Sequence, residues 1–209
     1  MKKTMLFLVI LSAIYVLVIL PIYLILSRAV IQWGVILIEF AIIISIMVIV
    51  AFLSVKKYRT IIKYYNSGEI DKALILCRKY IRWNPEGVLK QSVYMIMAII
   101  FFDKSDDDQF NSSLNNVKNE KMQSTKLYWQ TMNFLIKENL VEAKIYFQKF
   151  IDSNHNTHKI SQYVIFENLL KSIFSFINEE NEESKCNLIE AKKNIRNKKV
   201  NDYIEHLIK

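Results

Sequence analysis

The sequence predicts an all-α protein in which a two-helix transmembrane hairpin precedes a domain of antiparallel helix pairs. The chain has only 3 Gly and 2 Pro among 209 residues, too few for the many turns of a sheet-rich fold. Most of residues 1–55 are apolar, whereas residues 56–209 mix apolar and polar positions with short polar breaks. We therefore expect a transmembrane hairpin at residues 1–55 and a helical domain at residues 56–209.

The first apolar segment runs from Met5 to Leu26 and follows Lys2 and Lys3. Its 22 residues match the roughly 20 residues that a helix needs to cross a bilayer. A cleaved signal peptide has a shorter apolar region of about 7–15 residues before its small-residue cleavage site. Ser27 to Ala29 imitates such a site only weakly, so a retained span is expected and cleavage is the alternative.

A second apolar segment, at about residues 30–54, follows after a gap that leaves room only for a hairpin turn. Basic residues flank the two spans at the same end of the hairpin: Lys2 and Lys3 before the first, and Lys56, Lys57, Arg59 and Lys63 after the second. Positive charge in short flanks marks the cytoplasmic side. We expect a multi-pass cell-membrane protein with both termini in the cytoplasm.

The four basic residues after the second span are also expected to lie at the membrane surface, where each gains roughly 1 kcal/mol beside anionic lipid. The second span should continue directly into the first helix of the domain that follows. The lipid bilayer is therefore one expected partner.

Glu39 is an ionisable residue inside the second predicted span. Such a residue is a functional hypothesis, because placing its charge in lipid costs a few kcal/mol. The alternative is that Glu39 lies near the outer headgroups, since it follows the interfacial residue Trp33 closely and can pair with Arg28. Two helices alone do not enclose a transport pathway, so the first hypothesis requires several copies.

The charge of the chain argues against a nucleic-acid partner. The whole chain carries 28 basic and 20 acidic residues, and without Lys2, Lys3, Arg28 and Glu39 these fall to 25 and 19, a balance of +6. This is mild, whereas nucleic-acid binding usually requires a basic stripe on one face. Cys77 and Cys186 lack the spacing of a metal site or a disulfide framework.

Residues 56–209 are expected to form helices at about 56–65, 69–82, 86–102, 106–120, 124–137, 140–152, 159–177, 181–196 and 199–208. Asn84 should cap the third of these, with Pro85 in its first turn. The segment Val93–Phe102 is apolar on every side but too short to cross a bilayer, so it should be a buried helix. Ser105, followed by three aspartates, should cap the next helix.

The spacing of one segment is typical of a helical repeat. Gly68 is followed by Ala73, Cys77, Tyr80 and Pro85, and Tyr64 precedes Ala73 by nine residues. This pattern resembles a tetratricopeptide repeat, in which a small residue at the helix crossing lets two backbones approach. The departures are at Lys57, Ile61 and Tyr80, where the family usually has an aromatic and small residues.

The pattern returns 70 residues later, or two units of 35, as Phe134, Ala143, Phe147 and Phe150. A weaker echo consists of Ser184, Leu188 and Ala191, and the slot between the first and third units holds an apolar stripe of Phe110, Leu114 and Val117. In the third unit Phe150 replaces a small residue. The resemblance covers roughly residues 56–196, and an unrelated helical array is the alternative.

The resemblance implies a concave groove, lined by the first helix of each pair, that receives a peptide or another protein. The groove candidates are Tyr58, Arg59, Tyr65 and Asn66 in the first unit and Tyr128, Trp129 and Met132 in the third. Aromatic residues and Arg often carry binding energy at interfaces. The alternative for these residues is a role in the core or in a capping surface.

The sequence does not favour an enzyme. It contains no GxxxxGK[ST], GxGxxG or GxSxG motif, and three glycines leave little material for a phosphate-binding loop. His155 and His158 lie in a polar segment without the further ligands that a metal site requires. No catalytic residue, metal or cofactor is expected, and a membrane-bound enzyme is the third of the hypotheses.

These expectations together predict a membrane-anchored scaffold that recruits or organises a protein partner at the cytoplasmic membrane face. The runner-up is a small membrane subunit of a transport or export assembly in which the spans and Glu39 carry the function. The many Lys, Asn and Ile residues are typical of an AT-rich bacterial genome.

Overall fold

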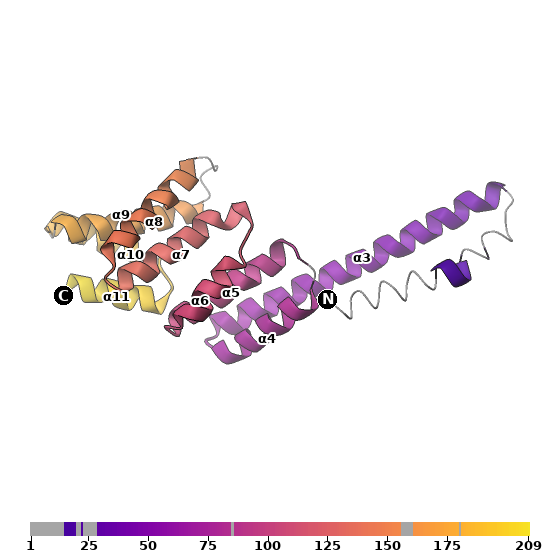
Figure 1. Ribbon diagram of the computed structural model, residues 1–209, viewed down its shortest axis with the longest axis horizontal. Helices are drawn as coiled ribbons and strands as arrows, with labels where there is room; N and C mark the ends of the chain where they lie inside the picture. Colours follow the sequence, from indigo (N-terminus) through magenta and orange to yellow (C-terminus); the bar gives the residue numbers. More distant parts are fainter. Residues whose placement is uncertain (1–14, 20–21, 23–28, 85, 156–160, 180) are drawn as a thin grey trace. The chain divides into compact units, whose positions relative to one another are not determined.

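The computed structural model describes residues 15–19, 22, 29–84, 86–155, 161–179 and 181–209. Within these residues every regular element is a helix, and nine α-helices pack in antiparallel pairs (Figure 1). The all-α prediction is therefore confirmed for the described part of the chain. The chain divides into an N-terminal unit, Met1–Val93, and a C-terminal unit, Tyr94–Lys209, and each is described by itself.

The N-terminal unit contains the short π-helix η1 (Tyr15–Ile19), the long helix α3 (Ala29–Asn66) and the helix α4 (Ile70–Trp83). The 38 residues of α3 correspond to a rod of about 57 Å at 1.5 Å per residue. This helix runs without a break from the second predicted span into the first helix of the predicted domain (Figure 1). The expected continuation is confirmed.

The apolar part of α3 is exposed. Large apolar side chains with exposed fractions of 47–67% are Ile38, Phe40, Ile42, Ile43, Ile44, Met47, Val48, Ile49, Val50, Phe52 and Leu53. Water-soluble proteins rarely expose so continuous an apolar surface. Among the described residues, the stretch Ile38–Asn66 alone is long and apolar enough to cross a membrane. Most of the first predicted span, at about 5–26, lies outside the described residues.

The helix α4 packs antiparallel to the last part of α3 through a small-residue crossing. Ala73 and Cys77 are fully buried, Tyr80 is 3% exposed, and Ile61 of α3 is 1% exposed. A small side chain at a helix crossing allows the backbones to approach closely. Burial raises the pKa of the Cys77 thiol to about 12, so this cysteine is a packing residue and is not reactive.

Three turns between paired helices share one backbone geometry. Gly68, Ser105 and Glu138 have φ of 77°, 57° and 59°. In each turn this residue donates its backbone N–H to the carbonyl three residues earlier, at 3.1, 3.1 and 2.9 Å. The next residue donates to the carbonyl five residues earlier, at 2.9, 3.0 and 3.0 Å. These are the paired hydrogen bonds of a Schellman motif, which closes a helix with a left-handed residue.

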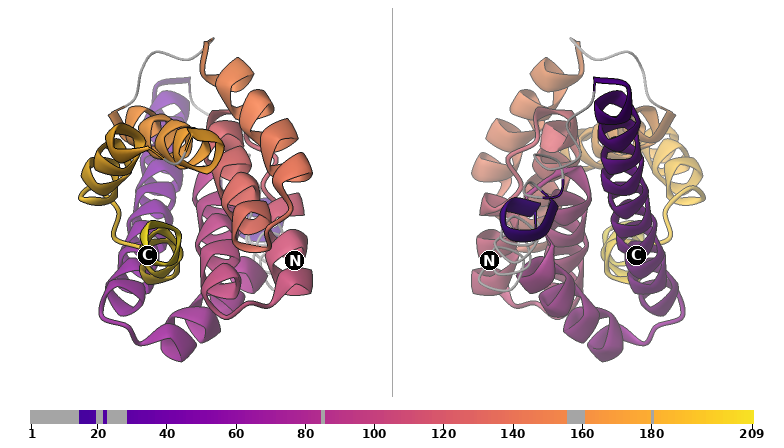
Figure 2. Two further views of the ribbon diagram at one scale, coloured as in Figure 1. Left: turned by 90° about the vertical axis from the view of Figure 1, so that its left-hand side faces the viewer. Right: turned by 90° about the vertical axis from the view of Figure 1, so that its right-hand side faces the viewer.

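The C-terminal unit holds most of α5 (Val88–Asp103), which begins in the N-terminal unit. It also contains α6 (Asp107–Asn115), the 3-10 helix η2 (Glu120–Met122), α7 (Gln123–Ile136), α8 (Leu140–His155), α9 (Ser161–Glu179), α10 (Glu182–Lys192) and α11 (Lys198–Ile208). Helix α8 packs on α7, and α10 packs on α9 (Figure 2).

Aromatic contacts join the helices of the C-terminal unit. The rings of Phe102 and Phe110 lie 6.0 Å apart between α5 and α6, and the rings of Phe147 and Phe174 stack at 4.8 Å between α8 and α9. Within Val93–Phe102, seven of the ten side chains are at most 8% exposed, which confirms the predicted buried helix. These contacts form the apolar core of the unit.

The crossing positions found in the sequence are also buried in the C-terminal unit. Ala143 of α8 is fully buried and Ser184 of α10 is 1% exposed. In α6 the same position, five residues after the left-handed turn residue, belongs to Phe110, which is 1% exposed. A phenylalanine fills the space that the small residue leaves open in α4 and α8, which explains why no small residue is visible there in the sequence.

Three predicted helix ends are wrong in detail. Asn84 ends α4 instead of capping α5: its backbone is extended, as expected before proline, and its side-chain amide donates to the Tyr80 carbonyl at 2.9 Å. Asp106, not Ser105, caps α6 and accepts from the Gln109 N–H at 3.1 Å. Helix α6 ends at Asn115, since the side chain of Asn116 donates to the Ser112 carbonyl and closes the last turn.

Helix α11 is joined to α5 by polar contacts. The Lys199 ammonium donates to the Phe102 carbonyl at 2.6 Å and to the Ser105 hydroxyl at 2.9 Å. The Asn197 amide donates to Asp103 at 2.7 Å. Burial holds the pKa of Lys199 below its ordinary value, opposed by the charges of Asp103 and Asp107. Lys199 thus satisfies carbonyl and hydroxyl groups at the C-terminal end of α5.

Candidate functional site

The groove candidates of α3 lie at the end of that helix. Arg59 and Asn66 are exposed, whereas Tyr58 and Tyr65 are half-buried. Residues seven apart share one face of an α-helix, so Tyr58 and Tyr65 form one row and Arg59 and Asn66 form another. These four side chains offer a narrow polar and aromatic surface over the last two turns of α3.

The groove candidates of α7 lie in the core instead. Tyr128, Trp129 and Met132 are 1%, 6% and 0% exposed. The Tyr128 ring stacks on Phe166 of α9 at 3.8 Å, and the Trp129 ring meets Phe102 of α5 edge-on at 5.1 Å. The sequence left the core open as the alternative for these residues, and they offer no surface to a partner in this unit. Large aromatic side chains were assigned to a groove although they suit a core equally well.

All four basic residues predicted for the membrane surface are exposed: Lys56, Lys57, Arg59 and Lys63. The structure adds residues of α4 that the sequence analysis did not single out. Arg78, Lys79 and Arg82 are exposed on the helix that packs beside α3. Their spacing of three or four residues on one helix was a signal for a basic face that could have been read from the sequence.

The end of α4 is fixed beside a defined point of α3. The Ser54 hydroxyl donates to the Asn84 side-chain carbonyl at 3.0 Å. Beside this hydrogen bond lies a cavity of about 140 Å³, lined by Lys57, Thr60, Ile61, Leu76, Lys79, Tyr80, Trp83 and Asn84. The Arg82 guanidinium lies 5.9 Å from the centre of the Trp83 ring, within the range of a cation–π contact.

Glu39 has one hydrogen-bonded carboxylate oxygen and one without a partner. The Tyr15 hydroxyl donates to Glu39 Oε2 at 3.4 Å, a long hydrogen bond between η1 and α3. Glu39 Oε1 is buried, and among the described residues it has no hydrogen-bond partner. The predicted pairing of Glu39 with Arg28 concerns a residue outside the described part. A buried carboxylate oxygen without a partner is energetically unfavourable.

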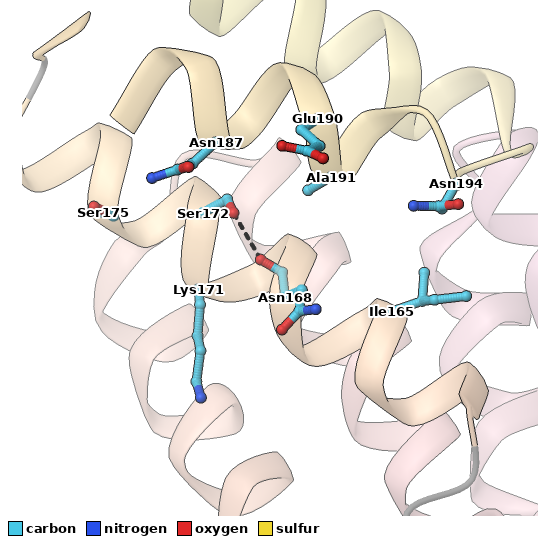
Figure 3. A pocket seen from close by; sticks show the side chains of 9 residues that line it. All are labelled: Ile165, Asn168, Lys171, Ser172, Ser175, Asn187, Glu190, Ala191 and Asn194. Atoms are coloured by element: carbon cyan, nitrogen blue, oxygen red, sulfur yellow. Dashed lines mark hydrogen bonds between the residues drawn. The ribbon is translucent and has the colours of Figure 1, made fainter. Parts of the chain in front are cut away.

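The C-terminal unit has a polar groove between α9 and α10 (Figure 3). The groove has a volume of about 440 Å³ and is lined by Ile165, Asn168, Lys171, Ser172, Ser175, Asn187, Glu190, Ala191 and Asn194. Most of these side chains end in amide or hydroxyl groups, which both donate and accept hydrogen bonds. Figure 3 shows Asn187 and Ala191 on α10 across the groove from Ser172 on α9.

Two groups of charges stabilise the turns and helix starts near these surfaces. The hydrogen bond from Lys72 lowers the pKa of Glu69 at the start of α4. The hydrogen bond from Lys137 lowers the pKa of Asp107 in the first turn of α6, and burial opposes this effect. Carboxylates in these positions also interact favourably with the positive end of the helix dipole. These groups stabilise the starts of α4 and α6.

Within the described residues, no group of three or more His, Cys, Asp and Glu side chains could hold a metal ion. The side chains of His155 and His158 lie outside the described part, so the structure does not place them. Chemically, the described surfaces can form hydrogen bonds and ion pairs, and the long helix α3 can enter a lipid phase.

No protein-family model matches the chain, and no curated protein and no solved structure matches it. The resemblance to tetratricopeptide repeats therefore rests on the residues and turns of this chain.

Proposed function

We propose that the chain is a membrane-anchored scaffold that recruits or organises a protein partner at the cytoplasmic face of the cell membrane. One observation carries this proposal. The single helix α3 has an exposed apolar part, and the last part of the same helix packs on α4. A continuous helix couples a lipid-embedded segment to a helical domain without a flexible linker. The pair formed by α3 and α4 is then held at a fixed distance from the bilayer.

The second part of the proposal concerns the anchor. We place the apolar stretch Met5–Leu26 beside α3 as the other half of a two-span hairpin. The hydrogen bond between Tyr15 and Glu39 joins this stretch to α3 and supports the pairing. The basic residues that flank both spans support a cytoplasmic position for both termini.

The helical domain is proposed to be a divergent array of tetratricopeptide-like pairs. The three left-handed turns at Gly68, Ser105 and Glu138 recur roughly every 35 residues, close to the period of that family. Ala73 and Ala143 lie five residues after their turns and are fully buried. The same turn, the same crossing position and a similar period support a repeat better than the sequence pattern does alone.

The partner is proposed to bind as an extended peptide in the groove between α9 and α10. An extended peptide presents alternating N–H and C=O groups, and asparagine side chains satisfy both kinds. Asn168, Asn187 and Asn194 all line this groove, together with Lys171 and Glu190 of opposite charge. This assignment replaces the predicted groove at α7, whose side chains fill the core.

Photo-crosslinking in living cells tests the proposal. A photoreactive amino acid at Asn187, inside the groove, should give one discrete adduct in the membrane fraction. The substitutions Asn168→Ala and Asn194→Ala should reduce that adduct several-fold, because they remove hydrogen bonds to the peptide backbone. Both residues are exposed, so the substitutions should leave the fold unchanged. Circular dichroism of the variant should match that of the parent chain.

The matched control is a photoreactive residue at Lys144, which is exposed on α8 outside the groove. It should give no such adduct. An equally strong adduct from Lys144, or an adduct from Asn187 that the two asparagine substitutions leave unchanged, would contradict binding in the groove.

The second candidate is a small membrane subunit of a transport or export assembly. It is favoured by the buried oxygen of Glu39, which has no partner among the described residues. Glu39→Gln keeps the size of the side chain and removes its charge. Under this alternative the variant fails to complement a deletion strain while the Asn187 adduct persists. Under the scaffold proposal it complements fully.

A further inference from the structure

A second surface remains unassigned by the proposed function, at the end of α4 where this helix returns to α3. We define the hairpin root by Ser54 and Lys57 of α3, by Lys79, Arg82 and Trp83 of α4, and by Asn84 directly after it. The hydrogen bond from Ser54 to Asn84, at 3.0 Å, holds these two chain segments together. Asn84 also donates to the Tyr80 carbonyl, which fixes the amide in place.

The hairpin root lies at the end of the exposed apolar surface of α3. Phe52 and Leu53, which are 67% and 47% exposed, directly precede Ser54. Lys56 and Lys57 are the first charged residues after them. With α3 in the bilayer, the root therefore lies at the level where the hydrocarbon ends and lipid headgroups begin. Trp83 is 37% exposed there, and tryptophan is enriched at that level of membrane proteins.

The root carries positive charge that the described part of the chain does not neutralise. Six exposed basic residues lie within six positions of Ser54 or Asn84 in the sequence: Lys56, Lys57, Arg59, Arg78, Lys79 and Arg82. No ion pair found among the described residues involves any of them. Glu86, close to the root in sequence, is paired with Lys90 at 2.7 Å.

The acidic residues of this hairpin lie at its other end. Glu69 and Asp71 stand at the start of α4, about 20 Å from Trp83 along the helix axis. The carbonyl groups at the end of α4 carry partial negative charge, but the Tyr80 carbonyl already accepts hydrogen bonds from the backbone and side chain of Asn84. The charged residues that line the cavities at the root are all basic: Lys57, Arg78, Lys79 and Arg82.

The cavity at the root has the composition of a headgroup site. Its volume is about 140 Å³, and two basic residues, Lys57 and Lys79, line it together with Thr60, whose hydroxyl donates to the Lys56 carbonyl at 2.9 Å. Ile61 and Leu76 also line it. Ammonium groups bind phosphate oxygens, while the apolar lining suits the glycerol and first methylene groups of a lipid.

We propose that the hairpin root binds the phosphate-bearing headgroup of an anionic phospholipid. The proposal rests on the proposed function in one respect, that α3 enters the bilayer. Free inorganic phosphate offers the same oxygen atoms, but it gains nothing from the adjoining apolar surface of α3. The site selects a lipid because charge and apolar contact meet at one place. Anionic lipid would then hold α4 against the membrane.

Tryptophan quenching in vesicles tests this site with the full-length chain. In a Trp33→Phe, Trp129→Phe background, Trp83 is the sole tryptophan. The chain is reconstituted in phosphatidylcholine vesicles that contain a small fraction of either brominated phosphatidylglycerol or brominated phosphatidylcholine. We expect the anionic quencher to be several-fold more effective, and millimolar inorganic phosphate to leave this preference unchanged.

A root variant and a matched control separate specific binding from general attraction. The root variant carries Lys57→Gln, Lys79→Gln and Arg82→Gln, and it should lose the preference for the anionic quencher. The control carries Lys144→Gln, Lys149→Gln and Lys193→Gln, three exposed positions outside the cavity with the same change in charge. It should keep the preference.

The outcomes separate this proposal from the proposed function. Equal quenching by both lipids, or loss of the preference in the control, overturns the headgroup site and leaves the membrane anchor standing. Competition by inorganic phosphate overturns the assignment of a lipid ligand and indicates that the root binds a free anion. Absence of quenching by either lipid contradicts the placement of the root at the membrane, and with it the proposed anchor.

Discussion

Two helices of this protein, α3 and α5, each contain a segment that is apolar on every side, and the two segments differ in exposure. In α3 the side chains between Ile38 and Leu53 are largely exposed, with Ile44 at 52%. In α5 the side chains of Val93–Phe102 are mostly buried, with Ile100 at 0%. The residue types are almost the same in both segments. What separates them is length, since the α5 segment has only ten residues and is flanked by polar ones.

An apolar helix needs an apolar environment. The length of the apolar segment determines whether neighbouring helices of the same chain can provide that environment. A short segment is covered by neighbouring helices of the same chain, as Phe110 and Trp129 cover Phe102 of α5. The long apolar stretch of α3 is largely exposed in the described part of the chain, and it is long and apolar enough to cross a membrane. The following predictions apply this contrast, beginning with the largest expected effect.

The same substitution in the two helices should act on different properties. Ile100→Arg places an unpaired charge in the core and should destabilise the C-terminal unit by more than about 4 kcal/mol. Thermal unfolding of the detergent-solubilised full chain, followed by circular dichroism, should show loss of the cooperative transition. Ile44→Arg is the matched control and should leave that transition unchanged. A normal transition for Ile100→Arg would refute the assignment of α5 to the core.

Arginine in α3 should act on the membrane anchor instead. Each arginine at the centre of a span costs about 2.5–3.5 kcal/mol of insertion free energy. The double variant Ile44→Arg, Val48→Arg should therefore shift the chain from the carbonate-resistant membrane fraction toward the extractable fraction. Ile75→Arg, at a position of α4 that is 64% exposed, should stay in the membrane. An unchanged double variant would contradict a lipid environment for α3.

The crossing of α7 and α8 tests the buried side of the comparison. Ala143→Leu adds three carbon atoms where the side chain is 0% exposed, and such overpacking usually costs about 1–3 kcal/mol. The Tm should fall by about 2–4 °C for each kcal/mol. Val141→Leu, at a position that is 72% exposed, is the control and should leave the Tm unchanged. Equal Tm values for both variants would rule out a close crossing at Ala143.

The left-handed turn of the N-terminal unit should give a smaller effect. A Cβ at Gly68 would meet no atom within 4 Å, but its φ is 77°. Gly68→Ala should thus cost about 1–2 kcal/mol through backbone strain alone. Gly87 has the same open space without a positive φ, so Gly87→Ala should be neutral or slightly stabilising. Chemical denaturation measures both, and similar losses in the two variants would contradict the turn geometry.

The ion pair between Asp107 and Lys137 should give the smallest effect. Its carboxylate has a pKa below the ordinary value of 3.8, so its contribution is present above that value and disappears as the pH falls through the lower folded-state pKa. Both side chains are more than 40% exposed, which limits the contribution to under about 1 kcal/mol. Asp107→Asn should lower the urea midpoint slightly at pH 7. The difference between the parent and the variant should shrink as the pH falls below the ordinary carboxyl pKa of 3.8.

Much of the helical framework was predictable from local signals. The left-handed turn residue Gly68 and the small crossing residue Ala73 predict the helix pair formed by α3 and α4, because few residue types suit either position. Helix ends were less predictable, since Asn84 can cap a helix at either end. Its side chain also accepts a hydrogen bond from the hydroxyl of Ser54, a residue 30 positions earlier. Such long-range partners leave no mark in the local sequence.

The candidate site was less predictable than the fold. Trp129 and Tyr128 suit a groove and a core equally well, and the contacts with Phe102 and Phe166 decided for the core. The basic face of α4 lies beside α3 only because the turn at Gly68 reverses the chain. The groove at Asn187 likewise requires α9 and α10 side by side. In each case the surface or core contact forms only when two helices pack together, so it cannot be read from the sequence of one helix.

Cysteine accessibility in membranes tests the central claim most directly, that α3 crosses the bilayer and carries the helical domain into the cytoplasm. A Cys186→Ser chain retains only Cys77, which is buried and unreactive. In this background Ile44→Cys and Ser67→Cys are labelled with a membrane-impermeant maleimide. Ser67→Cys should react in inside-out vesicles and not in intact cells, and Ile44→Cys should react only after denaturation. Labelling of Ser67→Cys in intact cells, or of Ile44→Cys in sealed vesicles, would contradict the claim.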